Sequence, residues 1–212
     1  MALTLYYSPG SCSLAPHIAL EEIGAPFALV LVNTDQGECR TPEFRHINPK
    51  GRVPVLIDKD FKLTEAPAIL LHLAAFHPAA RLIPPSETGL VRTIEWFNWL
   101  SGSVHAVAVR MIWRPYDFTV DGSHTDAVVA KGKEELASAF AMIDERLSAA
   151  DWAIDGQYSV VDIFLLVFYR WGNRMRIDMK STYPAWTQHT YRLLERPAVN
   201  RALAQEKVSV WQ

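Results

Sequence analysis

A cysteine stands where the chain changes from a turn to a predicted helix. Cys12 follows Pro9 and Gly10 and precedes the helix that we expect over residues 13–23. A thiol at a helix N-terminus faces unpaired N–H groups and the positive end of the helix dipole, and both favour the thiolate. We therefore expect the pKa of Cys12 to fall from about 8.5 into the range of about 3.5 to 7.5 that activated cysteines show. The alternative is a small residue packed beneath the first turn.

A proline also interrupts a run that otherwise predicts a strand. In VPVLID, residues 53–58, Pro54 removes a hydrogen bond of the strand ladder, so it belongs at an edge or in a special turn. We expect a cis bond between Val53 and Pro54. That bond would leave the backbone N–H and C=O of Val53 free to bind a peptide-like ligand as an added strand.

Glu65 and Ala66 come just before Pro67, at a predicted helix start. Free N–H groups at a helix N-terminus hold a carboxylate, and the Glu65 carboxylate can accept from an ammonium group. An ordinary first-turn acid, stabilised by the helix dipole, is the alternative for Glu65. Together, the three features describe a site for a small peptide that carries a carboxylate, an ammonium group and a thiol.

The elements that must position these residues change character near residue 80. Before it, short strand-like and helical segments alternate, which predicts an α/β layer around a small sheet. We expect strands over 3–7, 27–32, 53–58 and 61–64 and helices over 13–23 and 67–76. Beyond the punctuated stretch 77–89 the pattern is helical throughout. We expect helices over 88–113, 126–149 and 160–171, and two more whose first turns begin at Pro184 and Pro197.

Composition limits the classes of partner. The chain has 212 residues, half of them hydrophobic, and a net charge of −2, so it can bury a sizeable core and offers no nucleic-acid footprint or polybasic membrane anchor. Its longest apolar run, 163–169, is too short to span a bilayer, and its start lacks the basic region of a signal peptide. Cys12 and Cys39 form no metal-ligand or disulfide pattern, and we expect no role for Cys39. We predict a cytoplasmic protein with small-molecule partners and no metal.

Five segments, in this order and spacing, resemble the soluble glutathione transferases, and their bacterial beta class most of all. They are YYSPGSCSLAPHIAL (6–20), INPKGRVPVL (47–56), LTEAPAIL (63–70), EWFNWLSGSVH (95–105) and YSVVDIFL (158–165). The resemblance extends along essentially the whole chain. It implies a thioredoxin-like α/β N-terminal domain over 1–80, an all-α C-terminal domain over 88–212, a homodimer, and glutathione as cosubstrate.

The resemblance also implies roles for individual residues. Cys12 would face the glutathione sulfur, with Ser11 as the other candidate for activating it. Glutathione itself would be bound by Val53, Pro54, Glu65 and Ala66, the last through its N–H. Where beta-class members tend to carry a lysine after the second strand, this chain has Gln36 and Gly37. Arg40 and Arg52 are then the candidates for the glycyl carboxylate.

His105 lies on a polar and small-residue face of the helix expected over 88–113. At about 100° per residue, this face is shared by Glu95, Asn98, Gly102, His105 and Ala106. Such a stripe is typical of a helix that lines a cleft. The resemblance matches His105 to a histidine that beta-class members place near the catalytic cysteine. The alternative is a core histidine bound to a backbone carbonyl.

Two further groups of residues complete the prediction. The segment 111–122 offers apolar contacts to an acceptor substrate through Trp113, Tyr116 and Phe118. We assign the aromatic residues Trp96, Trp99 and Trp171 to the core. Ser159 and Asp162 predict a capping box, which is a folding device without a catalytic role.

Three functions follow, in order of preference. The first is conjugation of the glutathione thiolate to small hydrophobic electrophiles, a detoxifying reaction, with the thiolate stabilised by the helix N-terminus, by Ser11 or Cys12, and by His105. The second is glutathione-dependent disulfide exchange by a monothiol route through Cys12. The third is non-catalytic carriage of apolar ligands.

Overall fold

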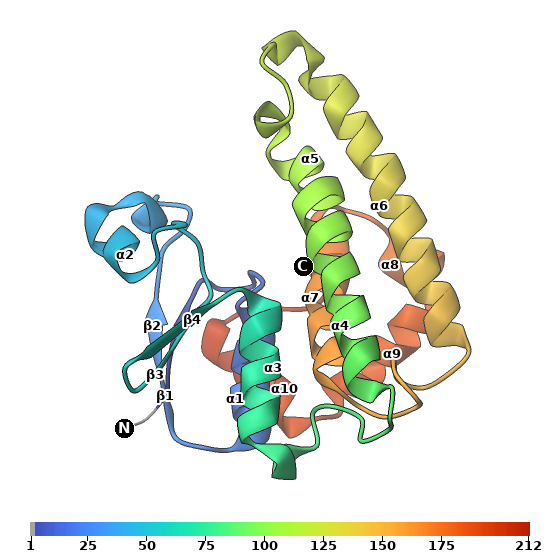
Figure 1. The fold of residues 1–212 in the computed structure, drawn as a ribbon. Helices are drawn as coiled ribbons and strands as arrows, with labels where there is room; N and C mark the ends of the chain where they lie inside the picture. The colour runs from blue at the N-terminus through green and yellow to red at the C-terminus, as the bar shows by residue number, and fades with distance from the viewer. Residues whose placement is uncertain (1–2) are drawn as a thin grey trace.

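A four-stranded sheet organises the N-terminal part of the computed structural model, which describes residues 3–212 (Figure 1). The strands are β1 (Leu3–Tyr7), β2 (Phe27–Leu31), β3 (Val55–Asp58) and β4 (Phe61–Thr64), in the order β2-β1-β3-β4. β1 runs parallel to β2 and antiparallel to β3, and β3 and β4 form a hairpin. The parallel pair needs a crossover, which α1 (Leu14–Ile23) supplies.

Two helices join this sheet to the rest of the chain. α1 is buried over residues 14–21 and contacts both α3 (Ala66–Phe76) and the C-terminal helices. Gly24 ends α1 in the left-handed conformation, with φ 69°, which glycine adopts at no steric cost. A third, short helix, α2 (Pro42–Ile47), lies away from this layer (Figure 1). The loop before α1 is therefore enclosed between the two parts of the molecule.

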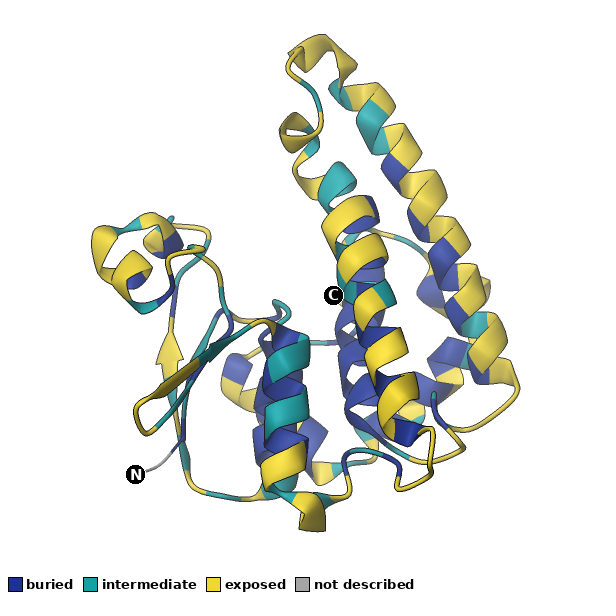
Figure 2. Cartoon of the chain, viewed as in Figure 1, coloured by how far each residue is buried: buried dark blue, intermediate teal, exposed yellow. Residues whose placement is uncertain are grey.

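The C-terminal part is helical. It contains α4 (Gly89–Trp99), a π-helical segment (Leu100–Val109), α5 (Arg110–Trp113), α6 (Thr125–Ser148), α7 (Val160–Arg174), α8 (Met179–Thr182), α9 (Pro184–Leu194) and α10 (Pro197–Glu206). The first three follow one another without a break and run beside α6 (Figure 1). α7 is buried along residues 160–172 and lies at the centre of the core (Figure 2). Within residues 3–212, no helix is both long enough and apolar enough to cross a membrane.

The predicted fold class, a thioredoxin-like α/β domain followed by an all-α domain, is confirmed. α9 and α10 begin at Pro184 and Pro197 as predicted. The strand predicted over 53–58 is wrong at its start, because β3 begins at Val55, after the proline. The sequence pattern also gave no sign of α2, or of the π-helical turns inside the predicted helix over 88–113.

The predicted capping box at the start of α7 is confirmed. The Ser159 hydroxyl accepts from the Val161 N–H at 3.2 Å, and the Asp162 carboxylate accepts from the Ser159 N–H at 2.8 Å. Asp162 also accepts from the Ala153 N–H and bonds the His189 ring, both at 2.8 Å. This fully buried carboxylate therefore fixes the start of the central helix and the loop before it.

Candidate active site

The loop between β1 and α1 is held by its own serine residues. The Ser13 hydroxyl donates to the Ser8 carbonyl at 3.1 Å and accepts from the Ser8 N–H at 3.1 Å. Because the Ser13 hydroxyl proton is thus used, the Ser11 hydroxyl, 2.8 Å away, donates to the Ser13 oxygen. It also accepts from the Ser13 N–H at 3.2 Å. The structure engages the Ser11 hydroxyl inside the loop, whereas the Cys12 thiol donates outside it, to Val53.

The Cys12 thiol points at the Val53–Pro54 peptide, where we expect the backbone of a ligand to dock (the docking peptide). Its Sγ donates to the Val53 carbonyl at 3.6 Å. Burial of the sulfur, helped by the negative charge of Glu65, raises the pKa of Cys12 to about 12, against opposing effects of a backbone hydrogen bond and Arg52. The predicted fall in this pKa is therefore wrong. α1 begins at Leu14, two residues after Cys12, and desolvation of the sulfur outweighs the effect of the helix terminus.

Val53 lies close to both cysteines. The Val53–Pro54 bond is cis, as predicted. The carbonyl of Val53 accepts from Cys12. Burial raises the pKa of the Cys39 thiol, and the nearby Val53 backbone opposes that rise. The expectation of free backbone groups at Val53 is wrong for its carbonyl, which the Cys12 thiol occupies. Cys39, which we expected to have no role, belongs to the surroundings of the docking peptide.

The turn before this peptide depends on Asn48 and Gly51. The buried Asn48 amide donates to the Arg52 carbonyl at 2.6 Å, and its oxygen accepts from the Lys50 N–H at 3.1 Å. Gly51 has φ 62°, and a Cβ there would come within 2.9 Å of the Cys39 carbonyl oxygen. The sequence NPKGR therefore turns tightly and projects Lys50 and Arg52.

Glu65 lies at the rim of the site, immediately before α3. Its side chain is 62% exposed and forms an ion pair with Lys50. Its backbone has φ 74° and ψ 121°, a conformation that is strained for a residue with a side chain and that clusters at functional sites. Ala66, buried, opens α3 and so contributes one of the N–H groups that lack a partner within the helix. Lys50 was missed by the sequence analysis, although its place in the turn opposite Glu65 was a usable signal.

His105 faces α7. Its ring lies 4.8 Å from the Trp171 ring and 6.3 Å from the Phe168 ring, between centroids. Burial, with the positive charges of Arg52 and Arg110, lowers the pKa of His105 to about 4, while Glu65 opposes this. The imidazole is therefore neutral at physiological pH. The charges of Arg52 and Glu65 shift the pKa of both Cys12 and His105. All four side chains therefore lie in one region of the molecule.

The predicted cleft-lining stripe stays a prediction, and its members differ in exposure. His105 is only partly exposed, whereas the other four members are exposed. These are Glu95, Asn98, Gly102 and Ala106. Gly102, His105 and Ala106 lie in the π-helical segment, whose i→i+5 hydrogen bonds change the phase of a face relative to an α-helix.

The predicted acceptor residues Trp113, Tyr116 and Phe118 differ in their contacts with the rest of the protein. Trp113 is 40% exposed and its ring lies 5.2 Å from that of Trp171, which also contacts His105. Tyr116 and Phe118 are 73% and 39% exposed on the loop after α5. The structure therefore joins Trp113 to the site through Trp171, which is buried as predicted but also borders the site.

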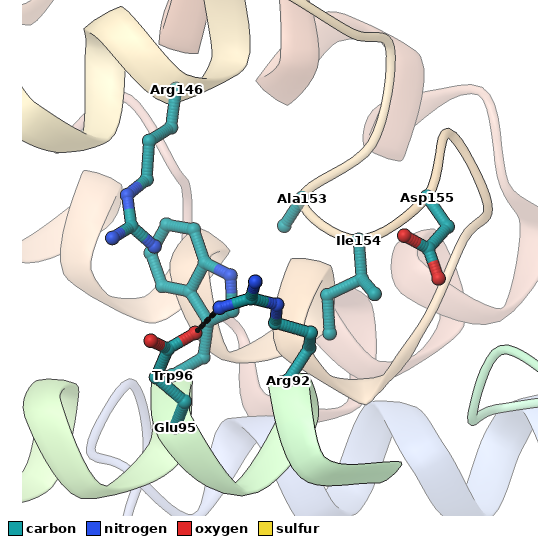
Figure 3. A pocket seen from close by; sticks show the side chains of 7 residues that line it. All are labelled: Arg92, Glu95, Trp96, Arg146, Ala153, Ile154 and Asp155. Atoms are coloured by element: carbon teal, nitrogen blue, oxygen red, sulfur yellow. Dashed lines mark hydrogen bonds and ion pairs between the residues drawn. The ribbon is translucent and has the colours of Figure 1, made fainter. Parts of the chain in front are cut away.

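A separate pocket of about 260 Å³ lies between α4, the end of α6 and residues 153–155 (Figure 3). The Arg146 guanidinium stacks on the Trp96 ring at 4.9 Å, and Arg92 bonds Glu95 at 2.9 Å. None of the predicted glutathione-binding residues lines this pocket.

Comparison with known proteins agrees with this geometry. Residues 1–75 match the N-terminal domain model of glutathione S-transferases, and residues 103–197 match the C-terminal domain model. The chain belongs to the glutathione S-transferase family. It is 30% identical to glutathione S-transferase GstA of Escherichia coli O157:H7 over 96% of this chain and 98% of that protein.

Solved structures of this family resemble the chain over nearly all its length. A glutathione transferase homologue from Sulfitobacter, with bound glutathione, has a TM-score of 0.89 at 29% identity, and the match covers 96% of this chain and 98% of that one. A bacterial beta class transferase from Sphingomonas chungbukensis has a TM-score of 0.83 at 32% identity, covering 97% and 100%.

Proposed function

We propose that this glutathione S-transferase joins the thiolate of glutathione to small hydrophobic electrophiles, as a member of the beta class. The observation that carries the proposal is the Cys12 thiol, a hydrogen-bond donor aimed at the Val53 carbonyl. A ligand that pairs with Val53 as an added strand places its own groups where this thiol now lies. The Sulfitobacter relative, whose structure contains glutathione, supports glutathione as that ligand.

Binding would exchange one set of hydrogen bonds for another. The cysteinyl unit of glutathione pairs with the backbone of Val53 and displaces the Cys12 S–H from the carbonyl. The freed S–H then donates to the glutathione sulfur and stabilises it as a thiolate. His105, a neutral imidazole above about pH 4, donates a second hydrogen bond to that thiolate, and the proton that the glutathione thiol releases passes to water. The thiolate then attacks the electrophile: in a substitution the new C–S bond forms as halide leaves, and in an addition the product takes up a proton from water.

The ends of the tripeptide meet the charges at the rim. On binding, the Glu65 carboxylate releases Lys50 and pairs with the ammonium group at the γ-glutamyl end of glutathione. The carboxylate at that same end accepts from the N–H of Ala66. Of the two arginines considered for the glycyl carboxylate, we assign Arg52, since its charge acts on both Cys12 and His105. Trp113 and Trp171 form the apolar side for the electrophile.

Disulfide exchange fits this site less well. The monothiol route needs Cys12 as a thiolate, because the thiolate attacks the disulfide. A pKa of about 12 keeps Cys12 protonated at physiological pH. A protonated Cys12, in contrast, can donate a hydrogen bond to the thiolate of bound glutathione.

We also propose that the protein is a cytoplasmic homodimer whose domains span 1–80 and 88–212. Apolar side chains are exposed on α3 and its neighbouring hairpin and on α4, and they support self-association. They are Phe61, Phe76, Leu90, Val91 and Ile94, between 39% and 69% exposed. Sedimentation velocity of the wild type and of Phe76→Glu tests this: we expect a dimer and a monomer, and a wild-type monomer would contradict the proposal.

The test of function is an assay of the purified protein with glutathione. The acceptor panel contains halogenated aromatics, isothiocyanates and glutathionylated disulfides. We expect conjugation with at least one electrophile, retained in part by Cys12→Ser, which keeps an O–H donor, and lower in Cys12→Ala. Rapid disulfide reduction that both variants abolish, with no conjugation, would establish the redox function instead. Binding of hydrophobic dyes without any turnover would establish the carrier.

A further inference from the structure

Gly10, two residues before Cys12, receives its backbone hydrogen bonds from the C-terminal domain. Its N–H donates to the Glu206 carboxylate at 2.7 Å. Its carbonyl accepts from the Arg170 guanidinium at 3.1 Å and from the Trp171 indole N–H at 3.0 Å. The loop of one domain is thus held at both polar groups of a single residue by α7 and α10 of the other.

The contact requires glycine at this position. Gly10 has φ +65°, and a Cβ there would lie 2.5 Å from the central carbon of the Arg170 guanidinium. Arg170 is 8% exposed and Glu206 is 3% exposed, so water does not compete for either contact. Arg170 is itself held, because it donates to the Ser209 carbonyl at 3.0 Å.

A second layer fixes the carboxylate. His17 of α1 bonds the other Glu206 oxygen at 2.9 Å and the Gln205 side-chain oxygen at 2.7 Å. The side chains of both His17 and Glu206 are fully buried. His17 therefore fixes the orientation in which the Glu206 carboxylate accepts from the Gly10 N–H.

We propose that Glu206 and Arg170 are positioning residues for Cys12: by clamping Gly10 they set where the thiol lies relative to the Val53–Pro54 peptide. The clamp acts two residues from the sulfur, across a tight loop, so a shift at Gly10 displaces the donor. The effect on turnover rests on the proposed function. The effect on Cys12 itself does not, and it is measurable without glutathione.

The test uses Glu206→Gln, Glu206→Ala and Arg170→Met, with Glu22→Gln as the matched control. Glu22 also joins α1 to the C-terminal helices, through Arg196 at 2.6 and 2.9 Å, but it bonds no residue of the loop. Each variant is checked by thermal melting. Alkylation of Cys12 by iodoacetamide is then followed by peptide mass spectrometry, and kcat and KM are measured for the glutathione reaction.

Glu206→Gln keeps an acceptor oxygen for Gly10 but loses a negative charge that raises the pKa of Cys12, alongside Glu65 and against Arg52. We expect faster alkylation than in the wild type at about pH 9. Glu206→Ala and Arg170→Met should lower kcat/KM at least ten-fold, while Glu22→Gln melts earlier but keeps the wild-type kcat/KM and alkylation rate.

Two results would overturn the inference. One is wild-type alkylation and kcat/KM in the Glu206 and Arg170 variants. The other is an equal change in Glu22→Gln, which would show a general loss of stability. If Glu206→Ala does not fold, Arg170→Met still decides, because it removes the bond to the Gly10 carbonyl; wild-type alkylation and kcat/KM in that variant contradict the clamp. Absence of any conjugation, with the expected alkylation pattern, would refute only the proposed function.

Discussion

Cys12 should be a slow nucleophile in the free protein. Its pKa rises from an ordinary value of 9.0 to about 12. At about pH 9 an ordinary thiol is half ionised, whereas only about one Cys12 in a thousand is a thiolate. We therefore expect iodoacetamide to alkylate Cys12 roughly 500-fold more slowly in the folded protein than in the unfolded chain at that pH.

The size of this effect follows from the surroundings of the sulfur. A pKa difference of about three corresponds to about 4 kcal/mol in favour of the protonated form. Desolvation contributes most, followed by the negative charge of Glu65. Since the folded-state pKa lies above the unfolded one, this contribution to stability is complete below about pH 9 and is lost as the pH rises toward about 12.

The assay follows Cys12 and Cys39 separately, by mass spectrometry of peptides sampled over time between about pH 7 and 10. Urea-unfolded protein gives the reference rate for the same peptides. Bound glutathione should slow the reaction of Cys12 further, because it covers the sulfur. Alkylation of folded Cys12 at the rate of the unfolded chain, or faster below about pH 8.5, would refute the reasoning and restore the thiolate.

Three other changes test the remaining assignments. Glu65→Gln should weaken glutathione binding by roughly 1.5 to 3 kcal/mol in calorimetry, while Lys50→Met should not weaken it; equal affinity in Glu65→Gln contradicts the ammonium contact. His105 holds its pKa near 4, so stability should fall as the pH drops from about 6.5 to about 4, a slope that His105→Phe should remove in thermal melts. Ser159→Ala should lower the free energy of unfolding by about 0.5 to 2 kcal/mol in urea with kcat/KM unchanged, and lost activity would show that the cap reaches the site.

Local signals in the sequence predicted most of the fold. Proline at the first helical position marked the starts of α9 and α10, and the spacing of Ser159 and Asp162 marked the start of α7. These features depend on residues within one turn of each other, so a single sequence displays them. The π-helical segment could not be predicted in the same way, because its residues also suit an α-helix.

The sequence named the members of the candidate site, and its prediction of their electrostatics was wrong for Cys12. Cys12, Val53 and Glu65 were found from the types of residue at a helix start or beside a proline. The pKa of Cys12 was predicted in the wrong direction because it depends on burial, and that burial comes from segments distant in the chain. Even the loop's anchor, Gly10, is held by a residue 196 positions away.

The two errors about this site have one cause, and together they favour the same chemistry. A thiol that packs against Val53 is desolvated, which raises its pKa, and it occupies the carbonyl that the ligand needs. Desolvation makes Cys12 a poor attacking group but preserves its proton for donation. When a peptide displaces it from Val53, that proton is already beside the incoming sulfur. In the proposed conjugation, this protonated thiol is the donor that the bound thiolate needs, whereas disulfide exchange would need Cys12 itself as a thiolate.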